Sequence, residues 1–253
     1  MKTIVIGDCH GDWKGLLAIL RATGGIDAEN RRLPGTTVIQ LGDLIHGGDP
    51  RGAPRDGVDD ELCAALALGL CDTILIGNHE LPHLWPDAGF PTFGGQRPIA
   101  PVLRDALLSA YRDGKLVPAY AHERWLLTHA GTTNTYINEC RDAADAAERL
   151  CVFFRRRLEN RQHRALFDAV GPARGGHDLH GGIFWSDWSE LALWSTPDLL
   201  LPQIFGHTPQ PEGWSRHGDS WCVDAGAALS GRVSAIVQDE AGAEWRPVVV
   251  ESE

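Results

Sequence analysis

Short apolar runs rich in β-branched residues recur along the chain. Each stops at a loop that contains glycine and a polar residue able to bind metal. A short apolar run bounded by glycine is typical of a buried β-strand. The pattern therefore predicts strands that end in polar loops, at residues 3–6, 36–41, 73–76, 125–127, 203–205 and 221–223.

Helical patterns lie between the first strands. Apolar residues recur at helical spacing in residues 13–20 and again in residues 62–70. The alternation suggests βαβ units with parallel strands, whose carboxyl ends share one edge where ligand sites usually form. The runs 232–237 and 245–250, around a turn at 239–242, predict a hairpin that closes the second half.

We expect one domain, 1–253, with insertions at about 81–120 and 132–201. Such insertions either carry specificity or form a solvated surface helix with a long connector, and we favour the second for the helical part of 132–201. The first strand starts almost at Met1, and no apolar run of about 18 residues occurs. These features predict a cytoplasmic protein with no membrane partner.

Composition narrows the choice of partners. The formal net charge of −11 disfavours duplex DNA, because nonspecific binding to DNA uses Lys and Arg to neutralise phosphates. Part of the acidity can instead serve as metal-ligand carboxylate. The 6 cysteines include no CxxC pair, and without an export signal we expect them to be reduced.

The polar loops contain the residues that suggest chemistry. The stretch 7–11, GDCHG, is weak by itself, since a turn with a capping Asp8 explains it equally well. Further candidates follow in the later loops. Mixed Asp, Asn and His ligands suit manganese, iron or zinc, and the absence of Cys from the candidate ligand set argues against a closed structural zinc site. The full set is Asp8, His10, Asp43, Asn78, His79, His129 and His207.

The order GDxHG, GD, GNHE, HAG, GHT resembles the calcineurin-like metallophosphoesterases, especially phosphoprotein phosphatases and bacterial diadenosine tetraphosphate hydrolases. The stretches 184–187 (FWSD) and 223–226 (VDAG) are similar to the same family. The resemblance implies an α/β fold of two facing mixed β-sheets flanked by helices. The alternation of strands and helices alone does not distinguish this from one doubly wound sheet.

The resemblance also implies roles for these residues. Asp8, His10 and Asp43 would hold one divalent metal ion; Asp43, Asn78, His129 and His207 would hold a second, with Asp43 bridging. Manganese is our first expectation for both ions, with iron or zinc as alternatives. His79 would protonate the leaving oxygen, or, in the simpler alternative, be a buried hydrogen-bonding imidazole. His83, His177 and His180 match no motif, and we expect them to be structural.

The sequence also departs from the family. Phosphoprotein phosphatases continue the second motif with an Asp that orients the catalytic His and an Arg that grips phosphate, whereas residues 42–48 read GDLIHGG. Arg51, Arg55 and Arg97 are candidates to replace that Arg, although they are equally explained as surface charges. We expect the tryptophans of the second half to pack the core or a lid: Trp185, Trp188, Trp194 and Trp214.

These features predict a metal-dependent phosphoester hydrolase, which uses a water activated by two metals. We favour phosphomonoesters, including phosphoserine or phosphothreonine, as substrates. A dinucleoside polyphosphate hydrolase is the alternative, and a scaffold that kept the fold without catalysis is a third hypothesis. The expected partner is a phosphorylated small molecule, a phosphoprotein or a nucleotide.

Overall fold

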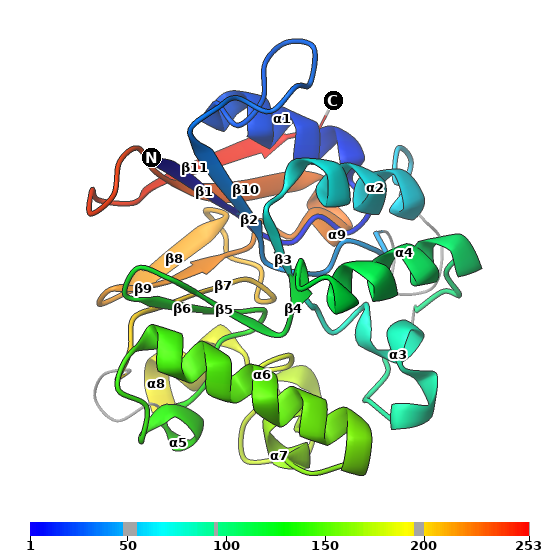
Figure 1. Ribbon diagram of the computed structural model, residues 1–253, viewed down its shortest axis with the longest axis vertical. Helices are drawn as coiled ribbons and strands as arrows, with labels where there is room; N and C mark the ends of the chain where they lie inside the picture. Colours follow the sequence, from blue (N-terminus) through cyan, green and yellow to red (C-terminus); the bar gives the residue numbers. More distant parts are fainter. Residues whose placement is uncertain (48–54, 94–95, 195–199, 253) are drawn as a thin grey trace.

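The computed structural model describes residues 1–47, 55–93, 96–194 and 200–252 (Figure 1). The strands are β1 (Lys2–Ile6), β2 (Thr36–Gln40), β3 (Thr73–Leu75), β4 (Leu116–Val117), β5 (Ala119–His122), β6 (Trp125–Thr128), β7 (Gln203–Phe205), β8 (Trp214–His217), β9 (Ser220–Val223), β10 (Arg232–Gln238) and β11 (Arg246–Glu251). The helices are α1 (Trp13–Thr23), α2 (Asp60–Leu70), α3 (Leu81–Leu84), α4 (Pro101–Arg112), α5 (Asn134–Ile137), α6 (Ala143–Asn160), α7 (Arg164–Phe167), α8 (Trp188–Trp194) and α9 (Ala227–Ser230), with short 3₁₀ turns at Pro86–Ala88 and Pro172–Arg174.

These strands form two mixed sheets. The first has the order β11-β10-β1-β2-β3-β4, in which β1 to β4 are parallel neighbours. The second has the order β5-β6-β7-β9-β8, with parallel strands β6, β7 and β9 at its centre. The expected architecture of two mixed sheets flanked by helices is therefore confirmed.

The C-terminal hairpin differs from its expected place. Strands β10 and β11 do pair antiparallel. However, β10 also pairs antiparallel with β1, with Val5 opposite Ile236. The hairpin therefore extends the sheet formed by the first half of the chain and does not close the second half. The chain returns to its own N-terminal strand, a pairing that no local pattern encodes.

Side-chain alternation in the strands creates two cores. In β1, Ile4 and Ile6 pack on the side of the helices, whereas Val5 joins a cluster between the sheets. In β6, Leu126 and Leu127 divide in the same way. Helices α1, α2 and α4 lie along the first sheet, and α6 lies along the second (Figure 1).

Helices form where the spacing predicted them, with one shift of face. In α1, Asp12 caps the first turn by accepting from the Gly15 amide, and Gly24 ends the helix in the left-handed conformation. In α2, the fully buried residues are Cys63, Ala64 and Ala67. The leucines of this helix, on which the predicted spacing rests, are only partly buried or exposed.

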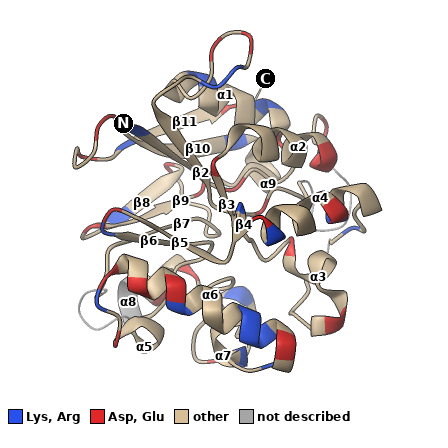
Figure 2. Cartoon of the chain, viewed as in Figure 1, with Lys and Arg blue, Asp and Glu red and all other residues tan. Residues whose placement is uncertain are grey.

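The two predicted insertions contain ordered elements. Residues 81–120 include α3, α4 and the edge strand β4, and residues 132–201 include α5 to α8. Helix α6 packs along β5 and β6 of the second sheet, buries Leu150 and Phe154 in the core, and carries charges of both signs (Figure 2). It is therefore a cover for the sheet as well as a charged surface. Over the ranges that the structure describes, no helix has the length and apolar character needed to cross a membrane.

Candidate active site

The loops after β1, β2, β3, β6 and β7 meet at the carboxyl edges of the two sheets. The sequence places a polar side chain at each of these strand ends, and parallel pairing aligns the ends. Six of the seven candidate residues are buried, and the His79 side chain is 12% exposed. The structure thus brings together all seven: Asp8, His10, Asp43, Asn78, His79, His129 and His207.

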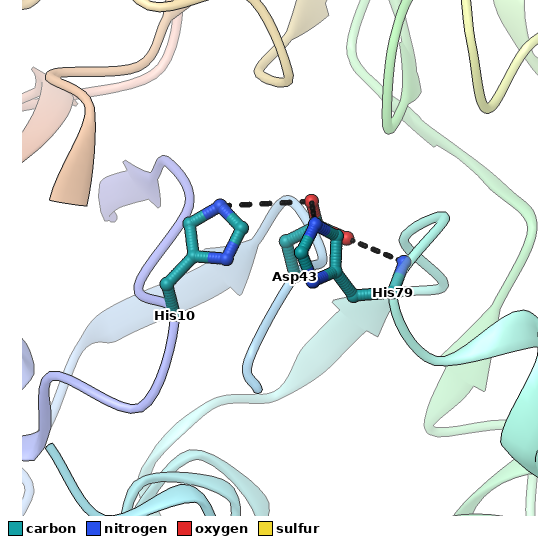
Figure 3. A group of neighbouring side chains, drawn as sticks. All are labelled: His10, Asp43 and His79. Carbon is teal, nitrogen blue, oxygen red and sulfur yellow. Dashed lines mark hydrogen bonds and ion pairs between the residues drawn. The ribbon is translucent and has the colours of Figure 1, made fainter. Parts of the chain in front are cut away.

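Asp43 lies at the centre of this cluster (Figure 3). Its Oδ2 atom is 3.7 Å from Nε2 of His10, 3.7 Å from Nε2 of His79 and 3.5 Å from Nε2 of His129. Burial opposes the charge of Asp43, but the imidazoles of His129, His79 and His10 hold its pKa well below the usual range. Asp43 is therefore an ionised carboxylate shared by several nitrogen ligands.

A second group of ligand atoms lies beside Asp43. Nε2 of His129 is 2.9 Å from Oδ1 of Asn78 and 3.1 Å from Nδ1 of His207. Ligand atoms of Asp43, His129 and His207 all lie within 4.8 Å of one another. Nε2 of His207 is buried without a hydrogen-bond partner among the described residues. The ring of His207 turns Nδ1 toward His129, and two imidazole nitrogens beside a buried carboxylate form a donor set that fits a divalent cation.

Backbone carbonyl groups orient the imidazole rings of two ligand candidates, His10 and His129. Nδ1 of His10 is 3.1 Å from the Ile45 carbonyl oxygen, and Nδ1 of His129 is 2.8 Å from the Leu41 carbonyl oxygen. A carbonyl oxygen only accepts, so in both rings Nδ1 carries the hydrogen. Nε2 is then the nitrogen that faces the cluster, an arrangement typical of metal-binding histidines.

Asp8 connects the two sheets at the site. Both of its oxygens accept from the His207 amide, at 3.2 and 3.1 Å. Burial raises the pKa of Asp8 well above its usual range, and the nearby carboxylate of Asp224 raises it further. The carboxylates of Asp8, Asp43 and Asp224 therefore lie close together away from water, so a bound cation would relieve their repulsion.

Backbone strain is concentrated at the site. His10, Asp43, His46 and His207 have φ values of 47°, 53°, 67° and 68°. This left-handed region costs a residue with a side chain about 1–2 kcal/mol. Its occurrence at four neighbouring site residues indicates that the loops are held in this shape for a function.

The two arginine candidates that the structure describes, Arg55 and Arg97, bind carboxylates away from the cluster. Arg51 lies outside the described residues. Nη2 of Arg55 is 2.7 Å from Oδ2 of Asp12, the residue that caps α1. Arg97 pairs with Asp60 at 3.4 Å and donates to the Gly47 carbonyl oxygen. Neither Arg55 nor Arg97 lines the cavity around the cluster.

Most of the remaining histidines and tryptophans pack as expected. The ring of His83 contacts that of His46, and His180 contacts Tyr136. Trp188 packs on Phe205, and Trp214 packs on Trp221. The exposed His177 joins no cluster here, and the Trp194 side chain lies outside the description. Trp185 belongs to the core and also lines the site cavity.

A cavity of about 500 Å³ opens beside the cluster, and three of its titratable lining residues, His46, Arg174 and Asp224, are not assigned to the site from sequence. His46 stands in the loop where the family pattern is broken, and Asp224 lies in the VDAG stretch, so both had a sequence signal. Arg174 lies in the second insertion and matches no motif. A fourth residue, Glu80 of the GNHE motif, lies behind the site and accepts from the backbone amides of Asp43 and Leu44.

Arg174 is the cationic side chain among the described residues that line this cavity. Its Nη2 donates to the His207 carbonyl oxygen and to Oγ1 of Thr208, each at 2.8 Å. Its Nε is 3.0 Å from Oδ2 of Asp187. Burial lowers the pKa of His207 well below its usual range, and Arg174 contributes in the same direction. The guanidinium is therefore fixed against the loop that contains His207 and Thr208.

Comparison with known proteins agrees with this geometry. The family model of the calcineurin-like phosphoesterases matches residues 1–229. A symmetrical bis(5'-nucleosyl)-tetraphosphatase of Citrobacter koseri is 29% identical over 138 residues, which is 53% of this chain. That alignment spans 44% of the relative, so less than half of its length is shared.

Solved structures share the fold at low identity. A cold-active protein-tyrosine phosphatase of a psychrophilic Shewanella species superposes with a TM-score of 0.60 at 15% identity, over 99% of this chain and 80% of that one. A protein serine/threonine phosphatase of Saccharomyces cerevisiae, with similarity to human phosphatase PP5, gives a TM-score of 0.57 at 13% identity, over 100% and 80%.

Proposed function

Because this chain belongs to the calcineurin-like phosphoesterases, we propose that it hydrolyses phosphomonoesters, with phosphoserine and phosphothreonine among them. The single observation that carries the proposal is the buried Asp43 carboxylate, which lies within 3.7 Å of an imidazole nitrogen of each of three histidines. Buried carboxylates and imidazoles in such proximity are typical of a site for divalent cations.

The ligand set fits two divalent cations. Asp8, His10 and Asp43 would hold the first, and Asp43, Asn78, His129 and His207 the second. Manganese is our first choice for both, with iron or zinc as alternatives, because the ligands mix imidazole, carboxylate and amide oxygen. When bound, such a pair would lower the pKa of a water and polarise the phosphoryl oxygens.

His79 would act on the leaving group. Its Nε2 faces Asp43, and its own amide donates to Oδ1 of Asp43 at 3.0 Å, which fixes its place relative to the cluster. Burial lowers the pKa of His79 well below its usual range. A protonated His79 would therefore give up its proton readily to the oxygen that leaves.

The charge of the cavity favours one phosphoryl group over several. Among the described lining residues, the cation Arg174 is accompanied by the carboxylates of Asp43 and Asp224. The lining also contains apolar residues, Phe93 and Trp185 among them. A polyphosphate chain requires several cations along its length. A monoester with a neutral or apolar leaving group matches this lining better.

A dinucleoside polyphosphate hydrolase is the second candidate. The observation in its favour is the similarity to the Citrobacter koseri tetraphosphatase, which covers about half of this chain. Trp185 and Phe93, whose ring centroids are 5.9 Å apart, also offer aromatic surface on which a base could stack. Cleavage of diadenosine tetraphosphate much faster than of a phosphopeptide would favour this second function over the first.

Hydrolysis of a substrate panel tests the proposal. The panel contains p-nitrophenyl phosphate, a bis ester, a phosphothreonine peptide and diadenosine tetraphosphate, each assayed with manganese and with chelator. We expect chelator-sensitive release of phosphate from the monoesters. Asp43→Asn should abolish it, whereas Asp219→Asn, a matched change at a half-exposed surface ion pair, should not.

Two other outcomes would contradict the proposal. Fast turnover of diadenosine tetraphosphate alone would favour the second candidate. No hydrolysis of any substrate, with manganese shown to be bound, would favour the scaffold hypothesis.

A further inference from the structure

A second histidine stands directly behind His79. Nδ1 of His46 is 3.2 Å from Nδ1 of His79. The other ring nitrogen of His46, Nε2, is 2.8 Å from the carbonyl oxygen of Arg97. His46 is 4% exposed, so solvent has almost no access to these two bonds. Its ring therefore links His79 to the segment that follows α3.

The direction of both hydrogen bonds follows from the carbonyl group. The Arg97 oxygen can only accept, so Nε2 of His46 carries the hydrogen. A neutral imidazole has one donor and one acceptor, so Nδ1 of His46 accepts from Nδ1 of His79. Burial lowers the pKa of His46 to about 4, in agreement with a neutral ring. Nε2 of His79 is then the nitrogen left to face Asp43 and the cavity.

The backbone of His46 is held in place from two sides. Its amide donates to Oδ1 of Asp60, at the start of α2, at 2.9 Å. Arg97 pairs with the same Asp60 and donates to the carbonyl oxygen of Gly47. The φ of 67° at His46 would suit glycine, yet the chain places an imidazole in this left-handed conformation.

We propose that His46 is a positioning residue for His79. By accepting from Nδ1–H of His79, it fixes the ring orientation and keeps that hydrogen on Nδ1, so that the proton a protonated His79 gives to the leaving oxygen is the one on Nε2. The inference rests on the proposed function, because it assumes that His79 assists the leaving group.

Two substitutions separate this role from simple packing. His46→Asn keeps an acceptor near the place of Nδ1, since its side-chain oxygen branches at the same atom. His46→Gln carries its amide group to the place of Nε2, so it retains the bond to Arg97 and loses the acceptor for His79. His83→Gln is the control, because that ring contacts His46 and forms no bond to His79 among the described contacts.

Phosphomonoesters with good and poor leaving groups provide the readout. A p-nitrophenolate leaves without a proton, whereas an alkoxide or phenolate needs one. For His46→Gln we expect kcat on phenyl phosphate to fall about tenfold or more, with KM and the rate on p-nitrophenyl phosphate nearly unchanged. His46→Asn should restore most of the loss, and His83→Gln should match the wild type on both substrates.

A measurement that does not depend on activity completes the test. Nitrogen-15 NMR of the histidine rings in metal-free protein should show hydrogen on Nδ1 of His79 and none on Nδ1 of His46. The inference is overturned if the hydrogen between the two rings is on Nδ1 of His46, or if kcat in His46→Gln falls equally on both substrates. It is also overturned if the His46→Asn and His46→Gln variants have the same kcat on phenyl phosphate. A wild type inactive on every monoester would contradict the proposed function itself, whereas the NMR result would still decide the hydrogen bond.

Discussion

Oε2 of Glu80 accepts a hydrogen bond from the backbone amide of Asp43 at 3.0 Å, which connects the loop after β3 to the loop after β2. The same carboxylate accepts from the amides of Leu44 and Gly77 at 2.8 and 2.9 Å. Asp43 in turn accepts from the His79 amide. The two motif loops therefore hold each other in place, with Glu80 behind the site and Asp43 within it.

Glu80→Gln tests this connection. Glu80 is fully buried, and the amide group would present a donor to backbone amides that need an acceptor. One unsatisfied buried group costs about 1–3 kcal/mol, so the free energy of unfolding should fall by about that amount. Urea unfolding measures the loss. Glu61→Gln, on the surface of α2, should cost much less, and equal losses would contradict the anchoring role.

His79→Ala should separate metal binding from turnover. We expect both metal ions to remain while kcat falls by about 10² or more, because a positioned proton donor contributes at that scale. Metal analysis of the purified variant and steady-state kinetics on a phosphomonoester check the two parts. Loss of one metal equivalent would instead assign His79 to the ligand set, which its 3.7 Å distance to Asp43 also permits.

Metal binding should release protons. Burial opposes the charge of His129, but Asp43 and Asp8 raise its pKa to about 10, so metal-free protein holds it protonated at neutral pH. A cation must displace that proton from Nε2, and the apparent affinity for manganese should therefore rise with pH up to about pH 10. Calorimetric titration in buffers with different enthalpies of ionisation would measure the proton released. A constant affinity from about pH 6 to about pH 9 would contradict this prediction.

The same shift contributes to the pH dependence of the metal-free fold. A histidine whose folded pKa is above its unfolded value of 6.5 contributes stability that is fully present below about pH 6.5. That contribution is lost as the pH rises through about 10. The buried His46, His79 and His207 have lowered pKa values and act in the opposite direction, so the contribution of His129 is read from the difference between wild type and His129→Gln. Urea unfolding in chelator should show a smaller difference in the free energy of unfolding between the two proteins at about pH 9 than at about pH 6.

Gly206→Ala should disturb the site through Asp8. A Cβ atom at Gly206 would collide with Oδ1 of Asp8, so the carboxylate would have to move from its place beside the His207 amide. We expect weaker manganese binding and lower stability, measured by calorimetry and thermal unfolding. Gly69→Ala is the control, because its Cβ meets nothing within 4 Å and it lies in helix α2, where alanine is favoured.

Arg174→Gln tests the cation of the cavity. The change removes the charge and the terminal nitrogens but keeps an amide group near the place of Nε, beside Asp187. If Arg174 binds the phosphoryl group, KM for a phosphomonoester should rise about tenfold, since hydrogen bonds to charged groups contribute about 1.5–3 kcal/mol. Arg55→Gln, whose ion pair with Asp12 lies outside the cavity, should leave KM unchanged. Equal KM values for wild type and Arg174→Gln would remove Arg174 from the binding site.

Much of the site follows from local sequence. A β-branched run fixes a strand, and the glycine that ends it fixes where the polar side chain stands. Gly77 shows why: a Cβ there would collide with Asp43, so the close approach of the two loops requires glycine. Because parallel strands share one edge, Asp8, Asp43 and Asn78 were expected to converge, and the structure brings them together.

Other features depend on contacts between distant segments. The sequence indicated a hairpin at β10 and β11, but its pairing with β1 was decided by packing across the whole chain. The same holds for the cationic side chain at the cavity: Arg55 was nearer to the motifs in sequence, yet the fold turns it to Asp12 and brings in Arg174 from the second insertion. Likewise, the bond between His46 and His79 joins residues 33 positions apart.

The sequence by itself determined the strand ends, the ligand residue types and the family resemblance, because each depends on a few neighbouring residues. The tertiary structure decided which loops meet, which arginine reaches the cavity and which nitrogen of His79 faces it. These depend on long-range packing and on the direction of hydrogen bonds, which residue spacing along a chain does not specify.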